Sequence, residues 1–249
     1  MPDAAGMNSI YEFAAIGAGA AAAGLASWAA VSPAAQLYGP VLRRTGSPLT
    51  LALTFDDGPN PAVTPALAGL LDRYRARATF FLIGRHVRAC PQLVAELVAR
   101  GHALGNHTDT HPNLLWLSAG RIREELARCQ DAVARAAGRQ PRWMRPPYGF
   151  RGPQLAAVVR RGGWAGVALW TRAAFDWKPQ PPQPMIRRLA RARGGEVLLM
   201  HDGDPFVDCA DRSHVLRALE HWLPRWTDAG LSFVTLDELA PAAAVAARN

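Results

Sequence analysis

Residues 49–59 read LTLALTFDDGP, a largely apolar run that ends in two adjacent carboxylates and a Gly-Pro pair. A run of this length, bounded by turn residues, is typical of a strand that is buried on both faces. Similar apolar runs, separated by helical patterns, recur until residue 236 and include residues 78–83 and 196–201. About seven such strands alternating with helices predict βα units and a parallel sheet, either doubly wound and open or closed into a barrel.

The chain length and the cysteine pattern limit the domain organisation. The chain has 249 residues, which suits one α/β domain of the barrel size class. Its cysteines at 90, 129 and 209 are odd in number and widely spaced, so we expect neither a disulfide framework nor a cysteine metal site. We predict an N-terminal apolar segment and linker over residues 1–46 and one domain over residues 47–249.

The N-terminal segment raises the question of a membrane. Residues 13–31 contain no charged side chain, and their number matches the roughly 20 residues that span a bilayer. The stretch fits a membrane anchor, the core of a signal peptide or a soluble Ala-rich helix. We favour the anchor because residues 1–12 lack the Lys or Arg that a secretory signal needs. We therefore expect association with a bacterial inner membrane or cell envelope, and one Arg pair at residues 43–44 does not fix the side.

The net charge narrows the choice of partners. It is formally +8, and almost all of the excess comes from arginine. The arginines are scattered, and no basic stripe is interleaved with aromatic residues, so we expect no nucleic-acid partner. A solvated, arginine-rich surface accounts for this composition. We expect the chain to act as a monomer.

Polar residues interrupt the apolar pattern at one recurrent place, the carboxyl end of a predicted strand. In a parallel barrel or sheet these ends lie on one face, where such folds place their functional sites. Several independent placements on one face are hard to obtain by chance, so these residues form the candidate site. They are Asp56 and Asp57 after the first strand, His107 and His111 after the third, Arg145 after the fourth, Asp176 and Trp177 after the fifth, and His201 and Asp202 after the sixth.

His107 and His111 suggest a metal. They are four residues apart, so a helical turn after the third strand would point both imidazoles the same way. With one carboxylate from Asp56 and Asp57 they make a three-ligand set with open positions, as at a catalytic metal. Imidazole and carboxylate suit Zn²⁺, with cobalt, nickel, manganese or iron as alternatives.

The remaining polar residues fit roles in hydrolysis. The second carboxylate of the Asp pair can accept a proton from an attacking water molecule. Arg145 is expected to hold Asp56 by a bidentate contact. His201 can donate a proton to a leaving amine, with Asp176 as its carboxylate partner. Leu199 lies on the same strand face as His201 and would form an apolar wall.

These residues also resemble the motifs of a known family, the polysaccharide deacetylases, also called the NodB-homology domain or carbohydrate esterase family 4. The resemblance covers residues 49–239, and five motifs occur in the family's order. They are TFDDGP at 54–59, HTDTH at 107–111, RPPYG at 145–149, DW at 176–177 and LLMH at 198–201.

The resemblance implies a fold, an activity and a division of roles. It implies an irregular (β/α) barrel of about seven strands and a metal-dependent hydrolase that removes acetyl groups from an N-acetylated sugar, whether a polysaccharide, an oligosaccharide or a glycolipid. The roles that it implies are Asp56 as base, Asp57, His107 and His111 as ligands, Arg145 and Asp176 as supports, His201 as acid, the Tyr148 N–H as oxyanion donor, and Pro147, Trp177 and Leu199 at the substrate.

One departure from the family pattern concerns Ala173, where an acidic residue is usual three positions before the Asp-Trp pair. We expect this change to affect substrate contacts more than the chemistry. Two other functions stay open on sequence alone. One is removal of O-acetyl esters by the same residues, and the other is carbohydrate binding on a scaffold that has lost catalysis.

Overall fold

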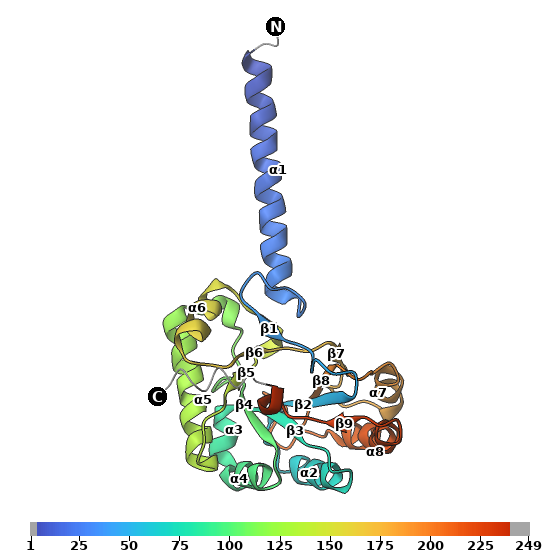
Figure 1. Ribbon diagram of the computed structural model, residues 1–249. Helices are drawn as coiled ribbons and strands as arrows, with labels where there is room; N and C mark the ends of the chain where they lie inside the picture. Colours follow the sequence, from blue (N-terminus) through green and yellow to red (C-terminus); the bar gives the residue numbers. More distant parts are fainter. Residues whose placement is uncertain (1–3, 240–249) are drawn as a thin grey trace.

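The computed structural model describes residues 4–239, with side chains from residue 16 onward. Its described part forms one nine-stranded sheet, and every pairing between strands of this sheet is parallel (Figure 1). The order across the sheet is β1-β6-β5-β4-β3-β2-β8-β7, with β9 also beside β2. The strands are β1 (Val41–Leu42), β2 (Thr50–Gly58), β3 (Ala78–Leu82), β4 (Ala103–Asn106), β5 (Trp143–Met144), β6 (Gly166–Ala168), β7 (Arg172–Ala173), β8 (Val197–His201) and β9 (Ser232–Phe233).

Helices surround the outside of this curled sheet (Figure 1), which confirms the irregular (β/α) barrel over an open doubly wound sheet. The α-helices are α1 (Ala4–Val31), α2 (Thr64–Arg73), α3 (Gly84–Ala89), α4 (Pro91–Ala99), α5 (Ala119–Ala137), α6 (Pro153–Arg161), α7 (Pro182–Leu189), α8 (Ser213–Asp228) and α9 (Leu236–Leu239), and two short 3₁₀ helices are η1 (Leu114–Trp116) and η2 (Pro147–Gly149).

Strand β2 shows how the sequence builds both faces of the sheet. Leu51, Leu53 and Phe55 pack into the large cluster shared with the helices, whereas Ala52 joins a smaller cluster with Phe81. Side chains alternate along a strand, so the face of Ala52 continues through residues 54 and 56 to the carboxyl end of β2. The carboxylate of Asp56 therefore lies on the interior side of the barrel, at the end of this apolar strand.

The barrel is not closed by strand pairing, because β1 and β7 are the two ends of the sheet. The chain after β1 crosses this gap, where Arg44 makes an isolated antiparallel bridge with Glu196. Strand β1 pairs with β6, although residues 41–42 fall in the predicted N-terminal linker. The sheet thus begins before residue 47, where we placed the domain boundary.

Helix α1 extends away from the rest of the molecule (Figure 1). Its apolar side chains at Ile16, Leu25 and Trp28 are exposed. Among the described residues we find no helix whose length and apolar content would let it cross a membrane. Of the predicted apolar segment, the side chains of residues 13–15 lie outside the described ones.

Candidate active site

A groove of about 640 Å³ opens at the carboxyl ends of β2 and β8. This volume suits a bound small molecule or a sugar unit. Asp56, Asp57, His107, His111 and His201 all line it, so the structure brings together five of the predicted site residues. Sheet register explains part of this grouping, because Asp56 and His201 are direct partners across β2 and β8.

Asp57, His107 and His111 form a compact group at the groove. Their ligand atoms all lie within 4.8 Å of one another, and all three residues are buried. The Asp57 Oδ1 atom is 3.4 Å from His107 Nε2 and 3.3 Å from His111 Nε2. One carboxylate oxygen and two imidazole nitrogens therefore converge on a single point.

The loop that carries the two histidines is not helical, so the predicted helical turn was wrong. Thr108 and His111 have left-handed backbone angles, with φ of 68° and 62°. The Glu125 carboxylate on α5 holds the loop by accepting hydrogen bonds from the N–H groups of Asp109 and Thr110, at 3.0 and 2.9 Å. Two left-handed residues and a buried carboxylate produce the convergence that we attributed to helical spacing.

The donor set fits a divalent cation. Asp57 Oδ1 is buried and has no hydrogen-bond partner among the described residues, which is unusual for a carboxylate oxygen. The Nδ1–H of His107 donates to the Arg145 carbonyl at 2.7 Å, and this contact leaves Nε2 free to bind a metal. A metal would complete the bonding of both atoms.

Charge states in the group also suit a metal. Burial raises the pKa of Asp57, but its contact with His107 and the nearby histidine charges outweigh burial and hold the pKa well below its usual range. Burial, reinforced by His107, lowers the pKa of His111 to about 3. An ionised carboxylate and a neutral imidazole are the forms in which these side chains bind metal.

Asp56 has a different environment from its neighbour Asp57. Its Oδ1 accepts a hydrogen bond from Arg145 Nη1 at 2.7 Å, and its Oδ2 lies 3.8 Å from His107 Nε2. The prediction of a bidentate contact between Arg145 and Asp56 was wrong. Only Nη1 of Arg145 reaches Asp56, and the same atom also donates to Thr54 Oγ1 at 2.8 Å, while Nε donates to a carbonyl of β6. One oxygen of Asp56 is therefore fixed and the other faces the group of possible ligands.

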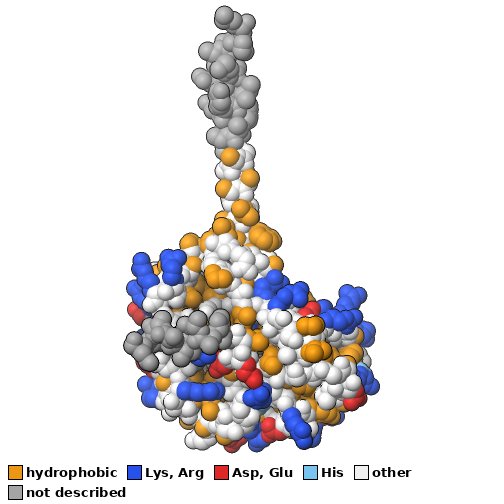
Figure 2. Space-filling view, viewed as in Figure 1, with side chains coloured by type: hydrophobic (Ala, Val, Ile, Leu, Met, Phe, Trp, Pro, Cys, Tyr) orange, Lys and Arg blue, Asp and Glu red, His pale blue; other side chains and the backbone are white. Residues whose placement is uncertain are grey.

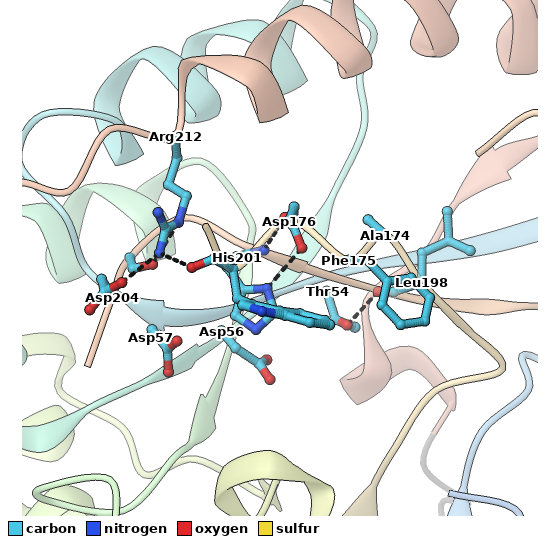
Figure 3. Close-up of polar contacts among 12 residues, drawn as sticks. Thr54, Asp56, Asp57, Ala174, Phe175, Asp176, Leu198, His201, Asp204 and Arg212 are labelled. Carbon is cyan, nitrogen blue, oxygen red and sulfur yellow. Dashed lines mark hydrogen bonds and ion pairs between the residues drawn. The ribbon is translucent and has the colours of Figure 1, made fainter. Parts of the chain in front are cut away.

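His201 lies between Asp176 and the Asp56–Asp57 pair (Figure 3). Its Nδ1–H donates to Asp176 Oδ1 at 2.9 Å, and its backbone N–H donates to Asp176 Oδ2 at 2.8 Å. Burial lowers the pKa of His201, but the charge and hydrogen bond of Asp176 outweigh burial and raise the pKa to about 9. The imidazole is therefore protonated at neutral pH.

Apolar and aromatic side chains flank these polar residues. Leu199, Trp177 and Tyr148 line the groove. The Tyr148 ring packs edge-on to His111, with ring centres 4.8 Å apart, and Trp177 packs against His201 at 6.5 Å. Pro147 is buried in η2 and does not line the groove. Ala173 lines the groove beside these residues, so the departure from the family pattern lies at its wall.

Several further residues surround the site. Phe206 packs edge-on to His111, and Val31 and Pro33 at the end of α1 line the groove. Buried Asp202 accepts a hydrogen bond from Thr64, and burial raises the pKa of Asp202 to about 7. Of these residues, only Asp202 was expected at the site, because it closes the sixth predicted strand together with His201. The loop and helix-end residues were missed because they carry no periodic signal.

Comparison with known protein families identifies relatives of the chain. The family model described as polysaccharide deacetylase matches residues 43–167. A chitooligosaccharide deacetylase from Bradyrhizobium sp. (strain ANU 289) is 35% identical over 195 residues, which cover 75% of this chain and 89% of that protein.

Solved structures show the same similarity in three dimensions. The peptidoglycan deacetylase PdaC from Bacillus subtilis matches with a TM-score of 0.69 and 30% identity, over 81% of this chain and 94% of that one. A CE4 family pseudoenzyme from Bacillus anthracis matches with a TM-score of 0.72 and 26% identity, over 82% of this chain and 69% of that one.

Proposed function

This chain belongs to the polysaccharide deacetylase family, and we propose that its substrate is a glycan that contains N-acetylglucosamine. It is a metal-dependent hydrolase that removes acetyl groups from an N-acetylated sugar. The observation that carries the proposal is the convergence of Asp57, His107 and His111 beside Asp56 and His201 in one groove. Relatives named for chitooligosaccharide and for peptidoglycan support a glycan substrate.

The first step that we propose is attack of water on the acetyl carbonyl. A divalent cation held by Asp57, His107 and His111 would supply Lewis-acid polarisation and make water more acidic. Asp56 accepts the proton of the attacking water, because its second oxygen faces the ligand group while Arg145 fixes the first. The backbone N–H of Tyr148 is proposed to stabilise the oxyanion.

The second step is departure of the amine. His201 is protonated at neutral pH through Asp176 and donates its Nε2 proton to the leaving nitrogen. Leu199 and Trp177 enclose the acetyl methyl group, since both line the groove beside His201. The two proton-transfer groups thus stand on adjacent strands, with the acetyl group between them.

An acetate-release assay on chitooligosaccharides and on purified peptidoglycan tests this function. We expect the wild-type protein to release acetate and Asp56→Asn to lose activity by about 100-fold or more, as for loss of a general base. Metal content and thermal unfolding of Asp56→Asn should match the wild type, which separates loss of chemistry from loss of fold. Retained turnover in Asp56→Asn would remove Asp56 as base, and no release from any glycan would favour a binding role.

We propose Zn²⁺ as the metal, because two imidazoles and a carboxylate form a set that zinc commonly occupies. Chelation with dipicolinate should abolish activity, and stoichiometric Zn²⁺ should restore it. Reconstitution with Co²⁺, Ni²⁺, Mn²⁺ and Fe²⁺ provides the comparison. Full activity after chelation would contradict metal dependence, and higher activity with another cation would contradict zinc.

We further propose that α1 anchors the chain in a membrane and that the chain acts as a monomer. The support is a 28-residue helix, free of charge over residues 13–31, that presents exposed Leu25 and Trp28. Full-length protein should sediment with membranes and require detergent for release, whereas a variant that begins at residue 32 should stay in the supernatant. Equal distribution of the two proteins between membrane and supernatant would overturn the proposal that α1 is an anchor.

Light scattering tests the proposal that the chain acts as a monomer. We expect the mass of one chain, and the mass of a dimer would contradict the proposal.

A further inference from the structure

A second cavity, of about 590 Å³, adjoins the catalytic groove at β7 and α7. Trp170, Ala173 and Phe175 line both spaces, so the two share a wall. The outer part of the second cavity is lined by arginines at 172, 187, 188 and 191, and we call it the arginine pocket. Figure 2 shows Lys and Arg side chains gathered on the side of the molecule where Figure 1 places α7.

The charge of the arginine pocket is largely uncompensated. Arg172 is neutralised by Glu196, at 2.8 Å. Arg188 donates to the Ala174 carbonyl at 3.2 Å, and its guanidinium lies 5.6 Å from the centre of the Phe175 ring, so it is held in place but keeps its charge. No acidic residue lines the pocket.

Arg187 and Arg191 are the available cations of the pocket. Both are exposed, and neither side chain has a hydrogen-bond or ion-pair partner among the described residues. Met185 and Leu189 on α7 are buried in the core, which fixes the helix that carries Arg187, and Arg191 follows in the turn after α7. Helix α7 and the turn that follows it thus present three charged guanidiniums around a cavity, those of Arg187 and Arg188 from the helix and that of Arg191 from the turn.

Some solvated arginines of this chain pair with acidic side chains on their own helix, and others, such as Arg123 and Arg128, have no ion-pair partner among the described residues. Arg121 and Arg217 are exposed on helices and pair with glutamates three residues later. Such i,i+3 pairs are typical of a solvent-facing helix. Arg187 and Arg191 instead border a cavity that leads to the catalytic groove and lack acidic partners. Their position beside this cavity, more than the lack of an acidic partner, distinguishes them from the other exposed arginines.

We propose that the arginine pocket binds an anionic group of the substrate, a phosphate or a carboxylate, while the N-acetyl group occupies the catalytic groove. Guanidinium groups match the paired oxygens of both anions and can bind them with two parallel hydrogen bonds. Ala173 lies at the wall that the groove and the arginine pocket share. Its small side chain leaves space there for a substrate that occupies both. This proposal rests on the proposed function and adds that the preferred glycan carries negative charge.

The test compares neutral and anionic substrates that offer the same N-acetylglucosamine unit. The substrates are chitopentaose, chitopentaose with a reducing-end phosphate, and a glycan of equal length whose lactyl groups carry carboxylates. The test variant is Arg187→Gln/Arg191→Gln. The control is Arg123→Gln/Arg128→Gln, which removes the same charge from exposed positions on α5.

We expect the test variant to lower the ratio of kcat/KM for anionic over neutral substrate about tenfold, through KM, as for two lost contacts at a partly exposed site. The control should leave this ratio at the wild-type value. A fall with only one anionic substrate identifies phosphate or carboxylate as the ligand. An unchanged ratio with both, or an equal fall in the control, overturns the arginine pocket as a subsite.

Binding measured without turnover separates this proposal from the proposed function. Calorimetry with Asp56→Asn protein should show tighter binding of the anionic saccharides than of chitopentaose, and the two arginine substitutions should remove the difference. Acetate release with no preference for charge would leave the proposed function standing and overturn the subsite. Charge-dependent binding without acetate release by the wild-type protein would support the arginine pocket as a binding site and overturn the proposed deacetylase function.

Discussion

Asp56 and Asp57 are adjacent in the sequence but have opposite surroundings. Asp57 has a left-handed backbone, with φ of 71°, and meets two imidazoles, whereas Asp56 continues the strand and meets Arg145. The backbone change at Asp57 lets two neighbouring carboxylates point to different partners. Their different surroundings fit different roles, one as ligand and one as base.

The pH dependence of the reaction depends on His201 and Asp176. The acid form of His201 is present below its pKa of about 9 and is lost as the pH rises through that value. Asp57 also raises this pKa, and a bound cation would offset its charge, so we expect the alkaline limb of kcat/KM in the metal-loaded wild type at or below that pH. Asp176→Asn removes the charge that raises the pKa, so the limb should move to lower pH and kcat should fall about 100-fold.

A pH–rate profile for each protein checks this expectation. Substitution of Asp208, an exposed acid in the loop after β8, by Asn provides the control and should leave the limb in place. An alkaline limb that does not move in Asp176→Asn would contradict His201 as the acid under the control of Asp176.

At the residue scale, the sequence predicted the polar groups that the groove collects, because each one breaks an apolar strand at its end. Contacts made by residues far apart in the chain were harder to foresee. The division of Arg145 between Asp56, Thr54 and a carbonyl depends on side-chain reach in the folded barrel. The place of Phe206 depends on the path of a loop, which no periodic pattern specifies.

At the scale of elements, Glu125 links helix α5 to the histidine loop. It accepts hydrogen bonds from two backbone N–H groups and from the Thr110 hydroxyl, at 2.9 to 3.0 Å. Glu125→Ala should therefore weaken metal binding by about 10- to 100-fold, as supporting contacts to ligands usually do. Competition with a fluorescent chelator measures this change. The exposed control Glu124→Ala, whose partner is Arg121 on the same helix, should bind metal normally.

Gly203 is a second support, placed in the loop after β8. A Cβ atom at this position would lie 2.1 Å from the Asp57 carbonyl oxygen, so backbone would have to move. Gly203→Ala should lower the free energy of unfolding by about 2–3 kcal/mol, as overpacking does, and should also lower metal affinity. Gly69→Ala, inside α2 with open space around it, should instead raise stability by about 1 kcal/mol. Urea unfolding of both variants checks the contrast.

Elements with local signals were predicted well from the sequence. The ends of α5 follow from the residue types found there, since Ser118 caps the helix by accepting from Arg121 N–H and Gly138 ends it in the left-handed region at φ of 69°. The helical turn that we considered for the loop after β4 is absent. The shape of this loop depends on Glu125, which is distant in sequence, and on left-handed residues that are not glycine.

At the scale of the whole molecule, α1 is joined to the barrel through Arg151. Its backbone N–H donates to the Ala30 carbonyl at 3.0 Å, and its Nη2 donates to the carbonyls of Ser32 and Ala35 at 2.9 and 2.7 Å. The side chain is buried, and among the described residues only carbonyl oxygens accept its hydrogen bonds. The turn after α1 is therefore fixed to the loop that follows η2.

Arg151→Leu should release this connection. The carbonyls of Ser32, Ala35 and Gly149 lose the donor that this side chain supplies, which costs about 1–3 kcal/mol each where they stay buried. We expect faster trypsin cleavage at Arg43 and Arg44, together with a lower thermal midpoint. Arg123→Leu on exposed α5 is the matched control and should be cut at the wild-type rate. Equal cleavage of the two variants would show that Arg151 does not fix the turn.

The position of Val31 has a consequence for reach. Val31 ends α1, and both Val31 and Pro33 line the groove, so no slack chain separates the helix from the catalytic residues. If α1 anchors the chain at a membrane as proposed, the catalytic groove is confined to a thin layer next to the lipid surface, because no flexible segment separates it from the helix. Only the sugar units that lie within that thin layer would be deacetylated. A Gly/Ser spacer inserted after Val31 should deepen the layer and extend deacetylation to units farther from the membrane.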